Sequence, residues 1–252
     1  MSAPAPQKPP PKPRTRGPVL LAIGAAMSLL FLALSSWMLG LAIQIGGGFV
    51  FWKDKAVEHS LAMVQEDLGY IAAAPSSLLV GNTVAFSNKL MALVRRPFEK
   101  IGALAFYETI QKTPPAQPDL TPSNLTKGAE QTTRWVISGL ASFAMVAMLV
   151  AQDVLLRLSV ALFALPAFAL ACLMGTLDGF MRRDQRRWSG GRESSFLYHH
   201  AKRQTLWALT GGFGLYLSWP LGGFNPSYMV LIFTVLVAAG LSIWVGSFKK
   251  YL

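Results

Sequence analysis

Charged residues are scarce in this chain. Only 14% of its 252 residues are charged and 52% are apolar, whereas soluble domains carry about 25% charged residues. The shortage is concentrated in long apolar stretches, which argues against an ordinary soluble domain. Acidic residues are the rarer kind, and the net charge is +11. Because the basic residues cluster beside apolar stretches, the membrane surface explains the excess better than nucleic acid does.

Cysteine is nearly absent, and recognisable catalytic motifs are missing. The single cysteine, Cys172, excludes an intrachain disulfide and a multi-cysteine zinc site. Adjacent histidines such as His199 and His200 point about 100° apart on a helix, and His59 is expected on the other side of the membrane. No phosphate-binding loop, zinc-protease pattern or nucleophile elbow occurs. We therefore expect no catalytic, metal-binding or cofactor-binding residues, and no enzyme.

Composition divides the chain into seven segments of an all-α polytopic membrane protein. Proline and basic residues at the start favour a disordered tail, and the apolar runs are long enough to cross a bilayer. We expect about four transmembrane helices, with a helical periplasmic region between the first and the second. The expected segments are a cytoplasmic tail at 1–17, a first membrane helix at 18–52, a periplasmic region at 53–134, a long apolar helix or helix pair at 135–177, a basic cytoplasmic loop at 178–204, a membrane hairpin at 205–245 and a cytoplasmic end at 246–252.

Two features of these segments predict local structure. In the first membrane helix, Gly46-Gly47-Gly48 predicts a break. In the polar region, apolar residues at spacings of three and four predict an amphipathic helix, and these residues are Leu61, Val64, Leu68 and Ile71. The neighbours Glu66 and Asp67 point apart on such a helix and are expected on its solvated face. A second helical segment is expected over 84–112, kinked or split by Pro97.

The apolar stretch at 135–177 has two interpretations. It is either two spans with a tight turn at Gln152-Asp153, or one long helix whose first half packs outside the bilayer. Asp153 and Arg157 lie four residues apart, so a continuous helix would place them on one face as an ion pair. Such a pair is tolerated at an interface and is costly in lipid.

The basic segments favour an even number of spans. The N-terminal tail, the loop and the C-terminal end can all be cytoplasmic, as the positive-inside rule asks, if four helices cross the membrane. Those helices are expected near Val19–Leu41 and Leu158–Leu177 and in the final hairpin. Counting Trp135–Ala151 as a further span places the basic loop outside. A tight hairpin within Val19–Trp52 would restore a six-span alternative.

The basic loop is the densest group of side chains that could bind a partner. Arginines recur at a spacing of four, which gives one basic face if the helix continues, and such a face suits anionic lipid headgroups or acidic surfaces. A plain topology signal is the simpler explanation. The candidate lipid- or partner-docking residues are Arg182, Arg183, Arg186, Arg187, Arg192, Lys202 and Arg203.

Several motifs resemble one known family. They are Leu177-Asp178-Gly179, Arg182-Arg183-Asp184, Gly190-Gly191-Arg192-Glu193-Ser194-Ser195-Phe196, Tyr198-His199-His200-Ala201-Lys202-Arg203, the terminal Phe248-Lys249-Lys250-Tyr251-Leu252 and the patch Asp67-Leu68-Gly69-Tyr70. The sequence resembles the integrating conjugative element membrane protein family along most of its length. The resemblance implies a conjugation or type IV secretion machine, with a place near its coupling ATPase, and supplies no catalytic residues.

We therefore expect a non-enzymatic component of a conjugative DNA-transfer apparatus in the bacterial inner membrane, with both termini cytoplasmic. The expected partners are anionic lipids and other membrane proteins of the machine, including the coupling ATPase. An oligomer is allowed, and no sequence-specific binding of nucleic acid is expected. The alternative is a small transporter or channel subunit with Asp153, Arg157 and Asp178 near its path.

Overall fold

The computed structural model describes residues 17–52, 55–74, 76–112, 125–189, 203, 207, 211–219 and 225–247. Within residues 125–163, side chains are described only from residue 131 onward. These residues form helices joined by turns, and no strand occurs among them, which confirms the all-α class. The helices are α1 Pro18–Val50, α2 Ala56–Ala73, α3 Thr83–Lys100, α4 Ala103–Lys112, α5 Leu125–Phe163, α6 Leu165–Trp188, the short helix at 211–217, and α8 Pro226–Gly246.

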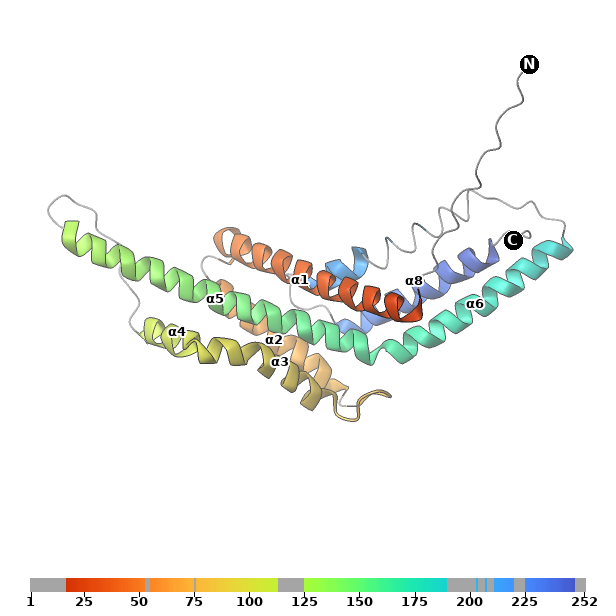
Figure 1. The fold of residues 1–252 in the computed structure, drawn as a ribbon, viewed down its shortest axis with the longest axis horizontal. Helices are drawn as coiled ribbons and strands as arrows, with labels where there is room; N and C mark the ends of the chain where they lie inside the picture. The colour runs from red at the N-terminus through yellow and green to blue at the C-terminus, as the bar shows by residue number, and fades with distance from the viewer. Residues whose placement is uncertain are drawn as a thin grey trace, which may run out of the picture.

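Helix α5 is the centre of the fold. It contacts each of α1, α2, α3 and α4 along its length, and Figure 1 shows α1 on one side of it and the other three gathered on the other side. Helices α6 and α8 lie side by side and form the most extensive helix pair. The molecule therefore has two parts, a helical cluster around α5 and a helix pair that continues beyond its end.

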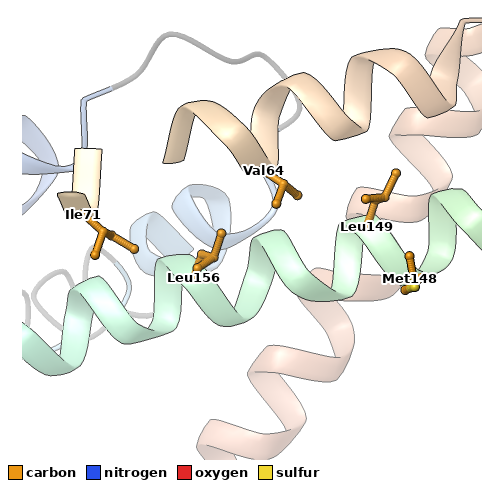
Figure 2. Packing of buried hydrophobic residues seen from close by; sticks show 5 residues of the cluster. All are labelled: Val64, Ile71, Met148, Leu149 and Leu156. Carbon is orange, nitrogen blue, oxygen red and sulfur yellow. The ribbon is translucent and has the colours of Figure 1, made fainter. Parts of the chain in front are cut away.

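The core of the α5 cluster forms where the apolar stripe of α2 meets α5. Val64 and Ile71 of α2 pack on Met148, Leu149 and Leu156 of α5 (Figure 2). Leu68 is partly buried in the same cluster, whereas Leu61 is 44% exposed. Helix α2 is therefore the amphipathic helix that the spacing predicts, with its stripe in contact with protein.

The expected break at Gly46-Gly47-Gly48 is wrong. Helix α1 continues through the glycines to Val50. The absence of a side chain at Gly47 instead makes room for the Trp52 ring, which folds back onto this residue. A Cβ built on Gly47 would overlap the ring. The Trp52 N–H donates to the Gly47 carbonyl at 2.9 Å, so the chain reverses just after the helix ends.

The helical segment expected over 84–112 is divided, but not at its proline. Pro97 lies inside the last turn of α3. The division falls at Gly102, whose φ of 75° is a conformation that glycine adopts without steric cost. This left-handed residue separates α3 from α4 and lets both pack on α5.

Helix α5 runs without a break through Gln152 and Asp153. Of the two interpretations, the one with a tight turn at these residues is therefore wrong, and the helix is continuous there. The helix is interrupted at Ala164 instead, and α6 begins at Leu165 with Pro166 in its first turn. Proline has no N–H and clashes with the preceding turn, which explains the bend. The expected second span, Leu158–Leu177, lies across this bend and is therefore wrong as one continuous helix.

Three of the described helices are long and apolar enough to cross a membrane. They are Pro18–Val50, Gln131–Phe163 and Pro226–Gly246. Apolar side chains remain exposed over most of α1 and much of α8, as expected for helices that face lipid. The chain is thus a multi-pass membrane protein.

Candidate functional site

A buried ion cluster is centred on Arg157 in α5. Its Nε donates to Asp67 Oδ2 of α2 at 2.9 Å, and its Nη2 lies 3.1 Å from Asp153 Oδ2, one turn earlier in α5. The three residues are only 4 to 8% exposed. The predicted i, i+4 pair is therefore present, and a third charged residue from another helix joins it.

Backbone carbonyls complete the surroundings of the guanidinium. Arg157 Nη1 donates to the carbonyls of Tyr216 at 3.0 Å and Trp219 at 2.7 Å, and its Cζ lies 5.9 Å from the Tyr216 ring centroid. The two carboxyl groups and the pair of carbonyls thus use all three nitrogens of the planar guanidinium, a donor arrangement that lysine could not supply. The cluster fastens α2, α5 and residues 211–219 at one point.

The expectation that Glu66 and Asp67 share a solvated face is wrong for Asp67. Asp67 points into the cluster, whereas Glu66 accepts a hydrogen bond from Tyr70 at 2.9 Å. That bond, with the charge of Glu66, raises the pKa of the Tyr70 phenol. The two adjacent acids do point apart, as a helix requires. Of the patch Asp67-Leu68-Gly69-Tyr70, noted for resemblance, Asp67 alone contacts Arg157, while Tyr70 bonds to Glu66.

A second polar contact joins α1 to α2. His59 Nδ1 lies 3.2 Å from Gln44 Oε1, and the His59 ring lies 4.1 Å from that of Trp52, measured between centroids. Burial lowers the pKa of His59, because a charged imidazole loses hydration in this place. Gln44 also donates to Met63 Sδ at 3.0 Å.

Close approach of backbones defines the α6–α8 interface. Gly175 and Gly179, four residues apart, both face α8, and a Cβ on Gly179 would lie 2.7 Å from Val245 Cβ. This is the small-xxx-small pattern that lets membrane helices approach closely. Ser242 of α8 donates to Asp178 of α6, which also pairs with Arg182 at 2.8 Å. Gly175 faces Ala238, and Gly179 faces Ser242 and Val245. Because the residue numbers increase in the same direction along both helices, α6 and α8 run parallel.

The arginines of the predicted basic face occupy the end of α6. Arg182 and Arg187 are exposed, and Arg183 and Arg186 are half-exposed. Arg187 lies 3.8 Å from Asp184. Arg203 is exposed as well, whereas Arg192 and Lys202 lie outside the described residues. The helix therefore continues past its apolar part and places four arginines within about two turns.

The three residues of the transporter alternative do not lie together. Asp153 and Arg157 belong to the ion cluster, and Asp178 belongs to the α6–α8 interface. Among the described residues, no group of three histidine, cysteine or acidic side chains could hold a metal ion. Sequence reasoning did not single out Gly175 and Gly179, although their spacing of four was a readable signal. It placed Asp67 on a solvated face, because no local spacing links Asp67 to Arg157.

These features define a class: a multi-pass helical membrane protein with an internal ion cluster and a basic helix end. A family model described as "IncC plasmid conjugative DNA transfer protein DtrJ-like" matches residues 51–249. The chain belongs to this DtrJ-like family. No curated protein and no solved structure matches it.

The family match confirms the conjugative context that the resemblance implied. It covers both the residues that form the ion cluster and the basic end of α6. The DtrJ-like family is the one whose model matches, and the resemblance to the integrating conjugative element family stays a prediction. Other components of a conjugation machine are therefore the chain's partners in a general sense.

Proposed function

We propose that the chain is a non-enzymatic component of the conjugative DNA-transfer apparatus in the bacterial inner membrane. It acts as a scaffold or accessory partner of the coupling ATPase or the channel. The observation that carries this proposal is the basic end of α6 in a conjugative-transfer family. Four arginines follow the apolar part of the helix there, and within the described part of the chain only two of them, Arg182 and Arg187, pair with an acidic residue. Such a surface suits anionic headgroups or an acidic protein surface just inside the membrane.

In the proposed topology, α6 replaces Leu158–Leu177 as the second of four spans. Its apolar half exposes large side chains that need lipid or another helix around them: Leu165, Leu170, Leu173, Met174 and Leu177. The parallel packing of α6 and α8 brings Trp188 and Gly246 to the same end. The basic loop and the C-terminal end would then both be cytoplasmic, which agrees with the positive-inside rule.

The alternative span in α5 exposes less apolar surface that lipid would have to cover. In its apolar window 61% of the residues are buried within the protein, against 6% in α1. Helices α1 to α4 cover that apolar surface. The region from α2 through most of α5 would then form the periplasmic part, and both termini would be cytoplasmic.

Charge reversal at the basic end tests the proposal. The variant changes Arg182, Arg183, Arg186 and Arg187 to glutamate, and a matched variant reverses four basic residues of α3: Lys89, Arg95, Arg96 and Lys100. The four α3 residues are all exposed and lie on the proposed periplasmic side. Conjugative transfer frequency, membrane abundance and recovery of the coupling ATPase by pull-down are measured together.

We expect transfer to fall at least about tenfold in the α6 variant, at normal abundance and orientation, because like charges placed opposite each other disfavour docking. The α3 variant should transfer normally. Replacement of the same arginines by glutamine separates docking from topology, because it removes the interaction without presenting a reversed charge. Normal transfer and unchanged partners in the correctly inserted α6 variants would sink the proposal.

A further inference from the structure

A small cavity lies beside Asp153, between α1, α2, α5 and residues 217–219. Its volume is about 10 Å³, counted as space for the centre of a water-sized sphere. A polar site of this size holds one water molecule when two or more polar groups face it. The polar side chains in its wall are Gln44, Ser60, Asp153 and Ser218.

Two of these side chains carry an unpartnered atom. Asp153 Oδ1 and Ser60 Oγ form no hydrogen bond within the described part of the chain, although the residues are only 6% and 2% exposed. A buried polar atom without a partner costs about 1–3 kcal/mol. An occupant that bonds to both atoms would remove this cost.

The ion cluster next to the cavity has unequal charges. Two carboxyl groups, Asp67 and Asp153, surround the single guanidinium of Arg157, so full ionisation leaves one negative charge in excess. An uncompensated charge in a protein interior is so unfavourable that the group becomes neutral instead. The cluster therefore needs one further positive charge.

We propose that Asp153 binds a proton and that the cavity binds one water molecule bridging Asp153 and Ser60. Both carboxyl groups contact Arg157, Asp67 at 2.9 Å and Asp153 at 3.1 Å, but only Asp153 also lines the cavity. The protonated carboxyl of Asp153 donates to the water, and its other oxygen still accepts from Arg157. A hard metal ion fits less well because it requires a shell of oxygen ligands, and the remaining wall is largely apolar: Met63, Leu149, Val150 and Leu217.

The groups facing Asp153 come from every element around it. They are Asp67 of α2, Arg157 of α5 itself and Tyr216, while α1 contributes the neutral Gln44 and, through it, His59. All of these groups are retained when only Asp153 is changed. A comparison with a single variant at this position therefore isolates its proton.

The test compares the wild type with Asp153→Asn, using the full chain in detergent micelles and denaturant titrations between pH 5 and pH 8.5. An amide imitates the protonated acid, so the variant should fold. Aspartates of the unfolded chain are ionised above about pH 4, so the folded wild type holds one extra proton. Its folding constant, relative to that of the variant, should rise as the pH falls, by up to tenfold per pH unit.

A change at Ser60 tests the water separately. Ser60→Ala should lower the folding constant if the hydroxyl is bonded to water, and raise it if the hydroxyl is unpaired. Tyr216→Phe in both Asp153 backgrounds removes any contribution of the phenol. Asp153→Leu, which can bond to neither Arg157 nor water, should be far less stable than Asp153→Asn.

Four outcomes would overturn the proposal. The first is a ratio of wild-type to Asp153→Asn folding constants that stays constant or falls as the pH falls, and the second is failure of Asp153→Asn to fold. The third is stabilisation by Ser60→Ala. The fourth is stabilisation of the wild type alone by sodium or magnesium at constant ionic strength. The last result would assign the site to a metal ion. Each result is independent of transfer activity, so the proposed role in conjugation can fail while this site stands.

Discussion

Gly175 of α6 lies directly against the backbone of Ala238 in α8, so a Cβ built on Gly175 would overlap the Ala238 carbonyl oxygen. The parallel helix pair can form only because this position has no side chain. The contact sets the register of α6 against α8 and, with it, the position of the arginines at the end of α6.

Replacement of Gly175 by alanine should destabilise the helix pair. Overpacking a close contact costs about 1–3 kcal/mol, and the atom in the way is backbone. Gly24→Ala in α1 is the matched control, because a Cβ there meets nothing within 4 Å and alanine favours a helix. Unfolding in micelles should separate the two variants, and equal stability would contradict the packing described here.

Removal of the Arg157 side chain should be among the most disruptive single changes. Arg157→Met leaves two buried carboxyl groups without their partner, a loss of about 3–5 kcal/mol. The control is Arg95→Met, since Arg95 pairs with Glu99 at the surface, where both side chains are about half exposed; exposed pairs contribute at most about 1 kcal/mol.

Further replacement of both acids tests the cause of that loss. Arg157→Met combined with Asp67→Leu and Asp153→Leu should recover part of the stability, because an apolar core needs no charge compensation. Denaturant titration gives the difference. No recovery would mean that the three side chains act through shape rather than charge.

The pH dependence of stability should include a contribution from His59 that is opposite in sign to that of Asp153. Burial lowers the pKa of His59 from 6.5, so the unfolded chain binds a proton that the folded chain resists. Stability is therefore lost as the pH falls below about 6.5. Relative to His59→Gln, the wild type should weaken between pH 7 and pH 5, with Trp52 fluorescence as a local probe. A constant difference would show that His59 is equally hydrated in both states.

Accessibility of single cysteines should decide the topology. In a Cys172→Ala background, Leu78→Cys and Trp188→Cys place thiols at positions that are 88% and 92% exposed. In spheroplasts, whose inner membrane is intact and accessible from the periplasmic side, a membrane-impermeant reagent should label position 78. It should label position 188 only after lysis. Labelling of position 188 from outside would overturn the four-span arrangement.

Local patterns predicted the elements, and distant partners decided how these elements are used. The i, i+4 spacing of Asp153 and Arg157 was sufficient to predict their pair. Asp67 lies 90 residues before Arg157, so no local pattern could indicate their contact. The same limit applies to Leu61. Its spacing correctly assigns it to the apolar stripe of α2, but its exposure depends on where α5 lies, which the spacing does not predict.

Two irregularities of the chain had signals in the sequence that pointed to the wrong place or the wrong kind of structure. Pro166 interrupts the apolar stretch near Ala164, whereas one of the two interpretations placed a turn at Gln152-Asp153. Three consecutive glycines suggested a helix break, whereas their role is to admit the ring of Trp52. In both cases the local composition indicated an irregularity, and only the packing partner determined its kind.

The ion cluster also imposes an order on how the protein is made. Arg157 and Asp67 are synthesised well before Tyr216 and Trp219, whose carbonyls complete the guanidinium's hydrogen bonds. Until that later segment emerges from the ribosome and inserts, a charged group inside an apolar helix lacks half of its partners. A nascent chain stopped before residue 216 thus carries an Arg157 guanidinium that lacks two of its hydrogen-bond partners, the carbonyls of Tyr216 and Trp219.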